Sequence, residues 1–318
     1  MTAMIAAAAM GKVILFGEHA VVYGQPAVAL PFPAVRATAR AAFAPVGTGF
    51  TILARDVRRV LPVHLDDESP DNALTLAAQL LLRHLKLPKP DLTLEVTSTI
   101  PIGGGFGSGA AVSTAIMRVL LKAFRRTLDN ETLNSLVYEV EKHHHGTPSG
   151  IDNTVIVYER PVYFVRGAAL EPFSVGLPLT FVVAYSGVAA STRETVSAVR
   201  TLVESEPATY QPLLENIGTL VRAARISLEA GDAPTIGTLL NENHSTLQRL
   251  TVSSPLLDRL CEAARESGAL GAKLSGGGRG GNIIALAPDE GAAVGIVAAL
   301  RGAGAARTWI MPVLPPAP

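Results

Sequence analysis

Residues 101–111 read P-I-G-G-G-F-G-S-G-A-A, and the segments on either side of them differ in period. Between residues 91 and 99, apolar and polar residues alternate, which is the pattern of a half-buried strand. From 112 to 124, apolar residues recur at helical spacing, with Arg and Lys between them. The stretch therefore predicts a strand, a glycine loop and the start of a helix.

A glycine loop that leads into a helix presents backbone N–H groups with no side chain in the way. The positive end of the helix dipole adds to their attraction for an anion, most often a phosphate. A glycine-rich turn that serves only close packing has the same kind of sequence. This loop alone leaves both interpretations open, and the remaining sequence has to decide between them.

The overall charge argues for a small-molecule partner. The 318 residues include 27 Lys and Arg and 27 Asp and Glu, so the net charge is zero. No global field draws in nucleic acid or an acidic membrane surface, and we expect neither as a partner. The length and a hydrophobic content of 48% suit a globular protein of two domains.

Cys261 is the single cysteine, and it cannot form an internal disulfide. It lies among apolar residues of an expected helix, so we interpret it as a buried structural thiol. This favours a reducing compartment, and we expect a cytoplasmic protein. The N-terminal run M-T-A-M-I-A-A-A-A-M has no basic residue before its apolar part, which indicates a first strand rather than a signal peptide.

Three charged or titratable residues lie in the apolar segment G-K-V-I-L-F-G-E-H-A-V-V-Y-G at 11–24. Glycines divide this segment into short pieces, so we expect Lys12, Glu18 and His19 at strand ends or in turns. Each of them alone suits a solvated turn. Together, in such an apolar setting, they cost free energy unless they are paired or functional.

Two carboxylates follow the first glycine loop. A helix is expected from 131 to 144, capped by Asp129 or Asn130, ended by Gly146, and carrying Glu141 on its last turns. The segment H-G-T-P-S-G-I-D-N at 145–153 is expected to be a loop that brings Asp152 within reach of Glu141. Near a phosphate loop, such a pair suggests one metal ligand and one base.

The run of three histidines at 143–145 does not predict a zinc site, because consecutive side chains at a helix end diverge and no spaced Cys or His accompanies them. Residues 154–165 are expected to form two short strands, and 167–178 a linker. Further helices are expected over 72–85, 192–204, 210–230, 234–247, 255–267 and 292–300, and strands over 180–185, 283–286 and 309–313.

A second glycine loop, K-L-S-G-G-G-R-G-G-N, occupies 273–282. It satisfies G-x-G-x-x-G, but a strand follows it where a dinucleotide site requires a helix, so the context rejects that fold. The chain also lacks G-x-x-x-x-G-K-[ST], which excludes a P-loop enzyme. What remains is one glycine loop in each half of the chain, and two such loops can close on a nucleotide phosphate chain from both sides.

Taken together, the stretches at 11–24, 101–111 and 273–282 resemble the GHMP kinases. The combination of G-E-H-A-V-V-Y-G with H-G-T-P-S-G-I-D-N points to the branch of that family that phosphorylates mevalonate. The resemblance implies an α+β protein with domains at 1–176 and 177–318 and an active site in the cleft between them. It also implies a left-handed β-α-β crossover in the N-terminal domain and a ferredoxin-like C-terminal domain.

The resemblance also implies residue roles. Asp152 would be the base for the substrate hydroxyl, and Lys12 would favour the alkoxide and neutralise developing charge. Glu141 would hold Mg²⁺. The implied substrate contacts are Glu18, His19 and Thr192, with Ser149 ordering the Asp152 loop. The implied ATP contacts are Gly103, Gly104, Gly105, Gly107, Ser108, Gly109, Gly276, Gly277 and Gly278.

The chain departs from the family pattern at several positions. The phosphate loop of the family usually reads G-L-G-S-S-A-A, and its second serine helps coordinate Mg²⁺, whereas Gly109 stands at that position here. Either Ser108 or a water replaces that hydroxyl, or the metal binds more weakly. Arg279 and Asn282 replace small or cysteine positions of the last motif, and Arg279 could lie near the phosphates or point to solvent.

The implied function is ATP-dependent phosphorylation of the 5-hydroxyl of mevalonate, in isoprenoid precursor synthesis, with a homodimer as the assembly that the family suggests. Two alternatives stay open. One is a kinase of the same family that acts on another small hydroxy acid or on phosphomevalonate. The other is a non-catalytic sensor that binds nucleotide and ligand, which Gly109 would allow and which the intact set of Lys12, Glu141 and Asp152 argues against.

Overall fold

A computed structural model describes residues 4–67, 72–145, 148–171 and 173–316. The chain folds into two compact units that are interleaved in sequence. The first unit comprises Met1–Lys12, Pro31–Ile100 and Gly107–Arg160, and the second comprises Val13–Leu30, Pro101–Phe106 and Pro161–Pro318. The division thus falls within two strands and within the first glycine loop. The expected domain boundary at 176/177 stays a prediction.

One sheet has the strand order β1-β2-β5-β3-β4, with β6 paired to β2. Its strands are β1 (Ile5–Phe16), β2 (Ala27–Phe43), β3 (Phe50–Ala54), β4 (Arg59–Pro62), β5 (Leu92–Ser98) and β6 (Val162–Phe164). β5 is antiparallel to β2 and parallel to β3, with Ala39 and Ile52 opposite Val96 and Leu94. A helix, α1 (Ala73–His84), lies in the connection between the two parallel strands. The expected β-α-β crossover is therefore present, and its handedness stays a prediction.

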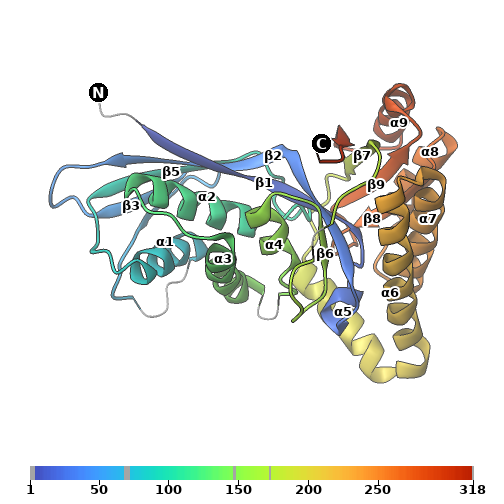
Figure 1. Ribbon diagram of the computed structural model, residues 1–318, viewed down its shortest axis with the longest axis horizontal. Helices are drawn as coiled ribbons and strands as arrows, with labels where there is room; N and C mark the ends of the chain where they lie inside the picture. The colour runs from blue at the N-terminus through green and yellow to red at the C-terminus, as the bar shows by residue number, and fades with distance from the viewer. Residues whose placement is uncertain (1–3, 68–71, 146–147, 172, 317–318) are drawn as a thin grey trace. The chain divides into compact units, whose positions relative to one another are not determined.

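Helices of the first unit cover one face of this sheet (Figure 1). They are α1, α2 (Ser108–Ala123), α3 (Asn130–His145) and α4 (Ile151–Tyr158). Asp129 caps α3, since its Oδ1 accepts from Thr132 N–H at 2.7 Å. The expected stop at Gly146 lies outside the described residues.

Of the two strands expected over 154–165, the second is confirmed as β6, and the first is wrong because α4 occupies its place. The β-branched run Val155, Ile156 and Val157 favours a strand by propensity. These side chains are 0–1% exposed in the helix, and their burial outweighs the propensity. Asp152 consequently lies in the first turn of a helix rather than in a loop.

The second unit contains a sheet in the order β10-β7-β9-β8, in which every pair is antiparallel. Its strands are β7 (Leu179–Tyr185), β8 (Gly271–Ser275), β9 (Asn282–Ala287) and β10 (Arg307–Val313). Helices precede β8 and β10, so the order along the chain is β-α-β-β-α-β and the strand order is 4-1-3-2. This is the expected ferredoxin-like arrangement.

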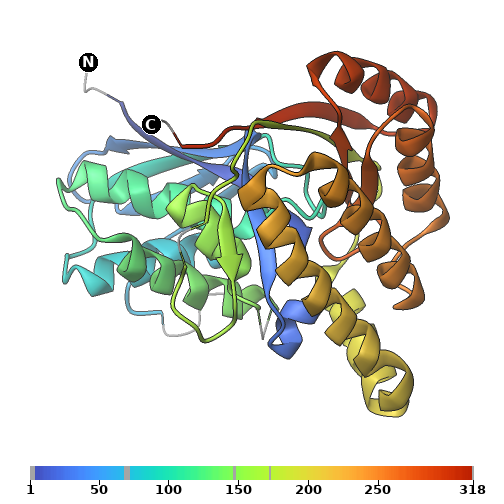
Figure 2. The same ribbon diagram turned by 45° about the vertical axis from the view of Figure 1, so that its right-hand side comes forward.

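The helices of the second unit are α5 (Thr192–Ser205), α6 (Pro207–Ala230), α7 (Ala233–Arg249), α8 (Pro255–Glu266) and α9 (Glu290–Gly302), with a short η1 (Ala20–Tyr23) near the N-terminus. Of these, α7, α8 and α9 pack on the sheet (Figure 2). Ser254 caps α8 as expected, accepting from Leu257 N–H at 3.4 Å. Helical segments from 192 to 267 are thus inserted between the first two strands of the sheet.

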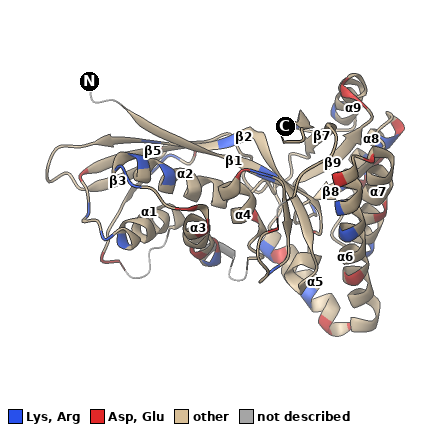
Figure 3. Cartoon of the chain, in the orientation of Figure 1, with Lys and Arg blue, Asp and Glu red and all other residues tan. Residues whose placement is uncertain are grey.

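Acidic and basic residues are both distributed along α6 to α9 (Figure 3). The apolar core of each unit consists of side chains from the facing strands and helices, such as Leu94 and Ile116 in the first and Val183 and Leu257 in the second. A helix long and apolar enough to cross a membrane is not found among the residues that the structure describes.

Candidate active site

Lys12 and Asp152 form an ion pair within the first unit. Lys12 Nζ lies 2.9 Å from Asp152 Oδ1, and the two side chains are 3% and 32% exposed. Lys12 was expected at a strand end, but it lies inside β1, which continues to Phe16. The strand backbone therefore fixes the lysine, while the first turn of α4 presents the more accessible carboxylate.

Gly107 makes room for this pair. The residue has φ +73°, and a Cβ added to it would lie 2.8 Å from Ile156 Cδ1 and 3.1 Å from Lys12 Cγ. A side chain at this position would strain the backbone and displace the lysine. The glycine at this position thus contributes to the site by close packing.

Glu141 belongs to the same group of residues. Its side chain is buried at the end of α3, and burial together with the negative charge of Asp152 raises its pKa to about 8, against an opposing effect of Lys12. A Cβ added at Gly109 would lie 2.7 Å from Glu141 Oε1, so the carboxylate packs against the first turn of α2. The absence of a side chain at residue 109 is what allows this approach.

This arrangement fits a magnesium ion by its chemistry. The carboxylates of Glu141 and Asp152, the latter in the first turn of α4 at the positive end of a helix, offer the hard oxygen donors that Mg²⁺ prefers. Ser108 is the first residue of α2 and directly precedes Gly109. Among the residues that the structure describes, no group of three or more His, Cys, Asp or Glu side chains is arranged so that it could hold a metal ion.

Ser149 lies just before α4. Its Oγ accepts from Ile151 N–H at 3.4 Å, and Thr154 Oγ1 donates to the Gly150 carbonyl at 2.7 Å. These hydrogen bonds lie on either side of Asp152 in the chain. The remainder of the expected loop includes Gly146 and Thr147, which lie outside the described residues, as do the side chains of His144 and His145.

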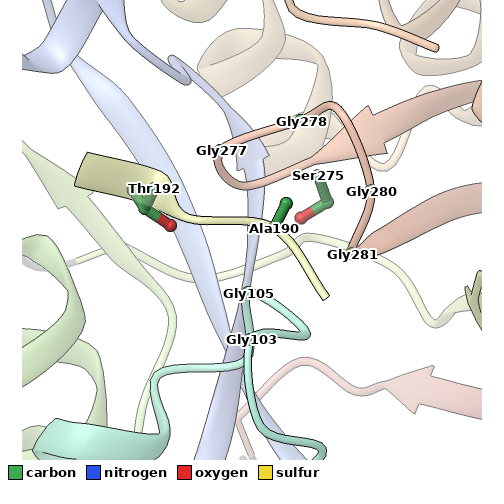
Figure 4. A pocket seen from close by; sticks show the side chains of 9 residues that line it. All are labelled: Gly103, Gly105, Ala190, Thr192, Ser275, Gly277, Gly278, Gly280 and Gly281. Carbon is green, nitrogen blue, oxygen red and sulfur yellow. The ribbon is translucent and has the colours of Figure 1, made fainter. Parts of the chain in front are cut away.

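A shallow pocket in the second unit is lined almost entirely by backbone (Figure 4). Gly103 and Gly105 of the first glycine loop lie beside the second glycine loop, and a Cβ added at Gly276 would be 3.6 Å from Gly105 Cα. The lining residues are Gly103, Gly105, Ala190, Thr192, Ser275, Gly277, Gly278, Gly280 and Gly281. Residues from three distant parts of the chain therefore meet around a surface rich in glycine.

Thr192 is the first residue of α5 and is exposed. A Cβ added at Gly277 would lie 3.0 Å from Thr192 Oγ1, and one at Gly278 would lie 2.0 Å from the Val252 carbonyl. Glycine at both positions keeps the second loop close to its neighbours. Arg279 has φ +58°, its side chain is exposed, and its Nε donates to the Thr251 carbonyl at 3.3 Å.

Glu18 is fully buried and paired with Lys273, which also donates to the Leu274 carbonyl at 2.7 Å. Burial lowers the pKa of Lys273, against the opposing effect of Glu18. Sequence reasoning missed this lysine, because it regarded residue 273 only as the start of a glycine motif. The available signal was a lysine directly preceding Leu274 in an otherwise apolar strand, which requires a buried partner.

His19 is also buried in the second unit, with φ +60°. Burial is the main cause that lowers its pKa to about 4, so the ring is neutral at pH 7. Nε2 lies 3.0 Å from the Gly277 carbonyl, which can only accept, so Nε2–H donates and Nδ1 is left as an acceptor. Among the described residues, Nδ1 has no hydrogen-bond partner.

Family models match both parts of the chain. The model described as "GHMP kinases N terminal domain" matches residues 72–160, and the one described as "GHMP kinases C terminal" matches residues 224–306. The expected family is thus confirmed, and the chain belongs to the GHMP kinases. Use of ATP follows from membership of this kinase family.

Several relatives of this chain are mevalonate kinases. The chain is 36% identical to a mevalonate kinase of Thermococcus sibiricus, over 90% of each chain. It is 37% identical to a mevalonate kinase of Pyrococcus horikoshii, over 91% of this chain and 90% of the relative. In both cases the likeness covers most of the chain.

Solved structures agree. A mevalonate kinase of L. major in complex with R-mevalonate matches with a TM-score of 0.84 and 30% identity, covering 100% of this chain and 98% of that one. A mevalonate kinase of methicillin-resistant Staphylococcus aureus matches with a TM-score of 0.72 and 30% identity, covering 98% and 99%. The expected two-domain GHMP kinase fold of class α+β is confirmed.

Proposed function

We propose that this chain phosphorylates the 5-hydroxyl of mevalonate with ATP and supplies isoprenoid precursor synthesis. The observation that carries the chemistry is the ion pair of Lys12 and Asp152, with Glu141 buried beside it in the first unit. The mevalonate kinases among the relatives supply the choice of substrate. Two alternatives are less favoured: a related kinase that acts on phosphomevalonate or another hydroxy acid, and a silent sensor. The reason is that these relatives are mevalonate kinases and match most of the chain.

In the proposed mechanism, Asp152 accepts the proton of the attacking hydroxyl, and its partial exposure leaves room for a substrate. Lys12 stabilises the alkoxide as it forms and neutralises charge on the transferred group. A positioned base contributes roughly 10²–10⁴-fold to the rate. Glu141 and Ser108 would hold Mg²⁺, which offsets phosphate charge when it is bound.

The substrate contacts are proposed in the second unit. Thr192 presents an exposed hydroxyl, and His19 presents Nδ1 as an acceptor. Glu18 keeps Oε2 without a partner among the described residues, while its other oxygen pairs with Lys273. Ser149 is proposed to order the turn that carries Asp152.

ATP is proposed to bind through backbone N–H groups of both glycine loops. These are Gly103, Gly104, Gly105, Gly107, Ser108 and Gly109 of the first loop, and Gly276, Gly277 and Gly278 of the second. Backbone amides suit phosphate oxygens because they concentrate partial positive charge without a side chain in the way. The same proposal includes a homodimer and a cytoplasmic location. Light scattering of the purified chain tests whether it is a dimer.

The test is an acceptor panel. The purified chain is incubated with ATP and magnesium and with mevalonate, phosphomevalonate, another short hydroxy acid or no acceptor, and the products are identified by ³¹P NMR. We expect a phosphomonoester only with mevalonate. A diphosphate product from phosphomevalonate would favour the related kinase, and nucleotide binding without any product would favour the sensor.

A further inference from the structure

Asn282, at the end of the second glycine loop, bonds the part of the first glycine loop that belongs to the second unit. It is the first residue of β9, and its side chain is fully buried. Its Nδ2 donates to the Gly104 carbonyl at 2.7 Å, across 178 residues of sequence. The amide orientation follows from chemistry, since a carbonyl can only accept and the nitrogen must therefore face it.

This hydrogen bond fixes the orientation of one peptide unit in the first glycine loop. The Gly104 carbonyl and the Gly105 N–H belong to the same planar trans peptide, so they point in opposite directions. Holding the carbonyl toward Asn282 turns the Gly105 N–H away from it. Among the described residues, this N–H has no hydrogen-bond acceptor.

The neighbouring contacts hold the loop in the same way. The Gly103 carbonyl accepts from Ala190 N–H at 3.1 Å, and the N–H of Gly104 donates to the Pro101 carbonyl at 3.2 Å. A Cβ added at Gly105 would lie 3.1 Å from Asn282 Nδ2, so the glycine at that position permits the approach. Two successive carbonyls of a flexible glycine sequence are therefore held from outside the loop.

We propose that Asn282 is a positioning residue for nucleotide binding. By holding the Gly104 carbonyl, it aims the Gly105 N–H as a preformed donor for a phosphate oxygen of ATP. Without that hydrogen bond, the glycine loop samples other peptide orientations, and ATP has to order it on binding. The inference rests on the proposed function, because it assumes that the loop binds the nucleotide.

The experiment compares Asn282→Leu, which removes the donor and keeps a side chain of similar branched shape, with Asn282→Ala, which also leaves a cavity. Asn241→Leu is the matched control, because the Asn241 amide bonds backbone groups of Leu270 and Ala272 in the same unit, away from the loop. Hydrogen exchange of residues 101–107 and ADP titration by calorimetry are measured without any acceptor. The KM values for ATP and mevalonate and the kcat are then measured with both substrates present.

We expect faster exchange of residues 101–107 in both Asn282 variants, and a Kd for ADP and a KM for ATP raised about tenfold, as for one lost hydrogen bond to a charged group. The KM for mevalonate should stay within about twofold, and Asn241→Leu should change none of these values. Unchanged loop exchange and nucleotide affinity in Asn282→Leu would overturn the inference, even if stability fell. The exchange and titration do not need turnover, so a failure of the proposed function would be seen separately.

Discussion

At the scale of single residues, the buried pair of Glu18 and Lys273 shows how the N-terminal motif is tied to the last glycine motif. Neither side chain is exposed. Ser275 makes a second connection, since its Oγ accepts from Ile14 N–H at 3.1 Å and donates to the Ile14 carbonyl at 2.8 Å. The motif at 273–282 therefore has a structural task beyond any contact with phosphate.

Replacement of Lys273 by Met leaves the carboxylate of Glu18 buried without its cation. We expect the free energy of unfolding to fall by about 3–5 kcal/mol, measured by urea denaturation. The double variant Glu18→Gln with Lys273→Met should be more stable than the single variant Lys273→Met. Arg55→Met, which breaks an exposed pair with Glu95, serves as the control and should cost less than about 1 kcal/mol. Equal losses in Lys273→Met and Arg55→Met would contradict the account.

Two buried histidines of the second unit predict the pH dependence of stability. Burial is the main cause that lowers the pKa of His19 and of His244 to about 4, from an ordinary value of 6.5. Between pH 6.5 and 4 the unfolded chain binds protons that the folded chain does not, so stability falls as the pH falls through this window. Each histidine contributes a slope of about 1.4 kcal/mol per pH unit.

The substitution His244→Gln tests this dependence, because Gln can still accept from the Leu274 N–H, which lies 3.3 Å from His244 Nδ1. We expect the loss of stability between pH 7 and pH 5, measured by urea denaturation at each pH, to be smaller in the variant than in the native chain. An identical slope in the variant and the native chain would show that His244 is not held neutral by its surroundings.

At the scale of elements, α7 and β8 approach each other backbone to backbone. A Cβ added at Gly271 would lie 2.0 Å from the Gly237 carbonyl, and one at Gly237 would lie 2.5 Å from the Leu270 carbonyl. The two glycines thus set the distance between helix and strand.

Gly271→Ala should therefore separate helix and strand and destabilise the second unit by about 1–3 kcal/mol, the range for overpacking a core. Gly302→Ala is the matched control, because it lies at the end of α9 with nothing within 4 Å of the added Cβ. The control should be neutral or more stable by up to about 1 kcal/mol. Thermal unfolding compares the two variants, and the reverse order of their stabilities would refute the packing argument.

The sequence predicted most elements of both units, because their periodicities and caps are local signals. It failed at α4, where a largely buried helix carries β-branched residues and its apolar run shows no helical period. The position of Lys12 was also missed. It was expected at a strand end or in a turn, but β1 runs without a break from Ile5 to Phe16. Among candidate site residues, Lys12, Glu141 and Asp152 came from the motifs, whereas the partner of Glu18 depends on pairing across 255 residues.

At the scale of the whole molecule, each compact unit holds its own group of candidate residues. The first unit holds the ion pair of Lys12 with Asp152 and the buried Glu141. The second holds His19, the Glu18–Lys273 pair and the pocket of glycine backbone. We therefore propose that proton transfer takes place in the first unit and that the second unit recognises the substrate.

The central claim is that Asp152 is the base of a mevalonate-dependent kinase. The most direct measurement is ADP release from ATP and magnesium, with and without mevalonate, by the native chain and by Asp152→Asn. We predict release that requires mevalonate and falls on the order of 10²–10⁴-fold in the variant, with similar KM values. Mevalonate-dependent release that is undiminished in Asp152→Asn would contradict the assignment of the base, and release that ignores mevalonate would contradict the function.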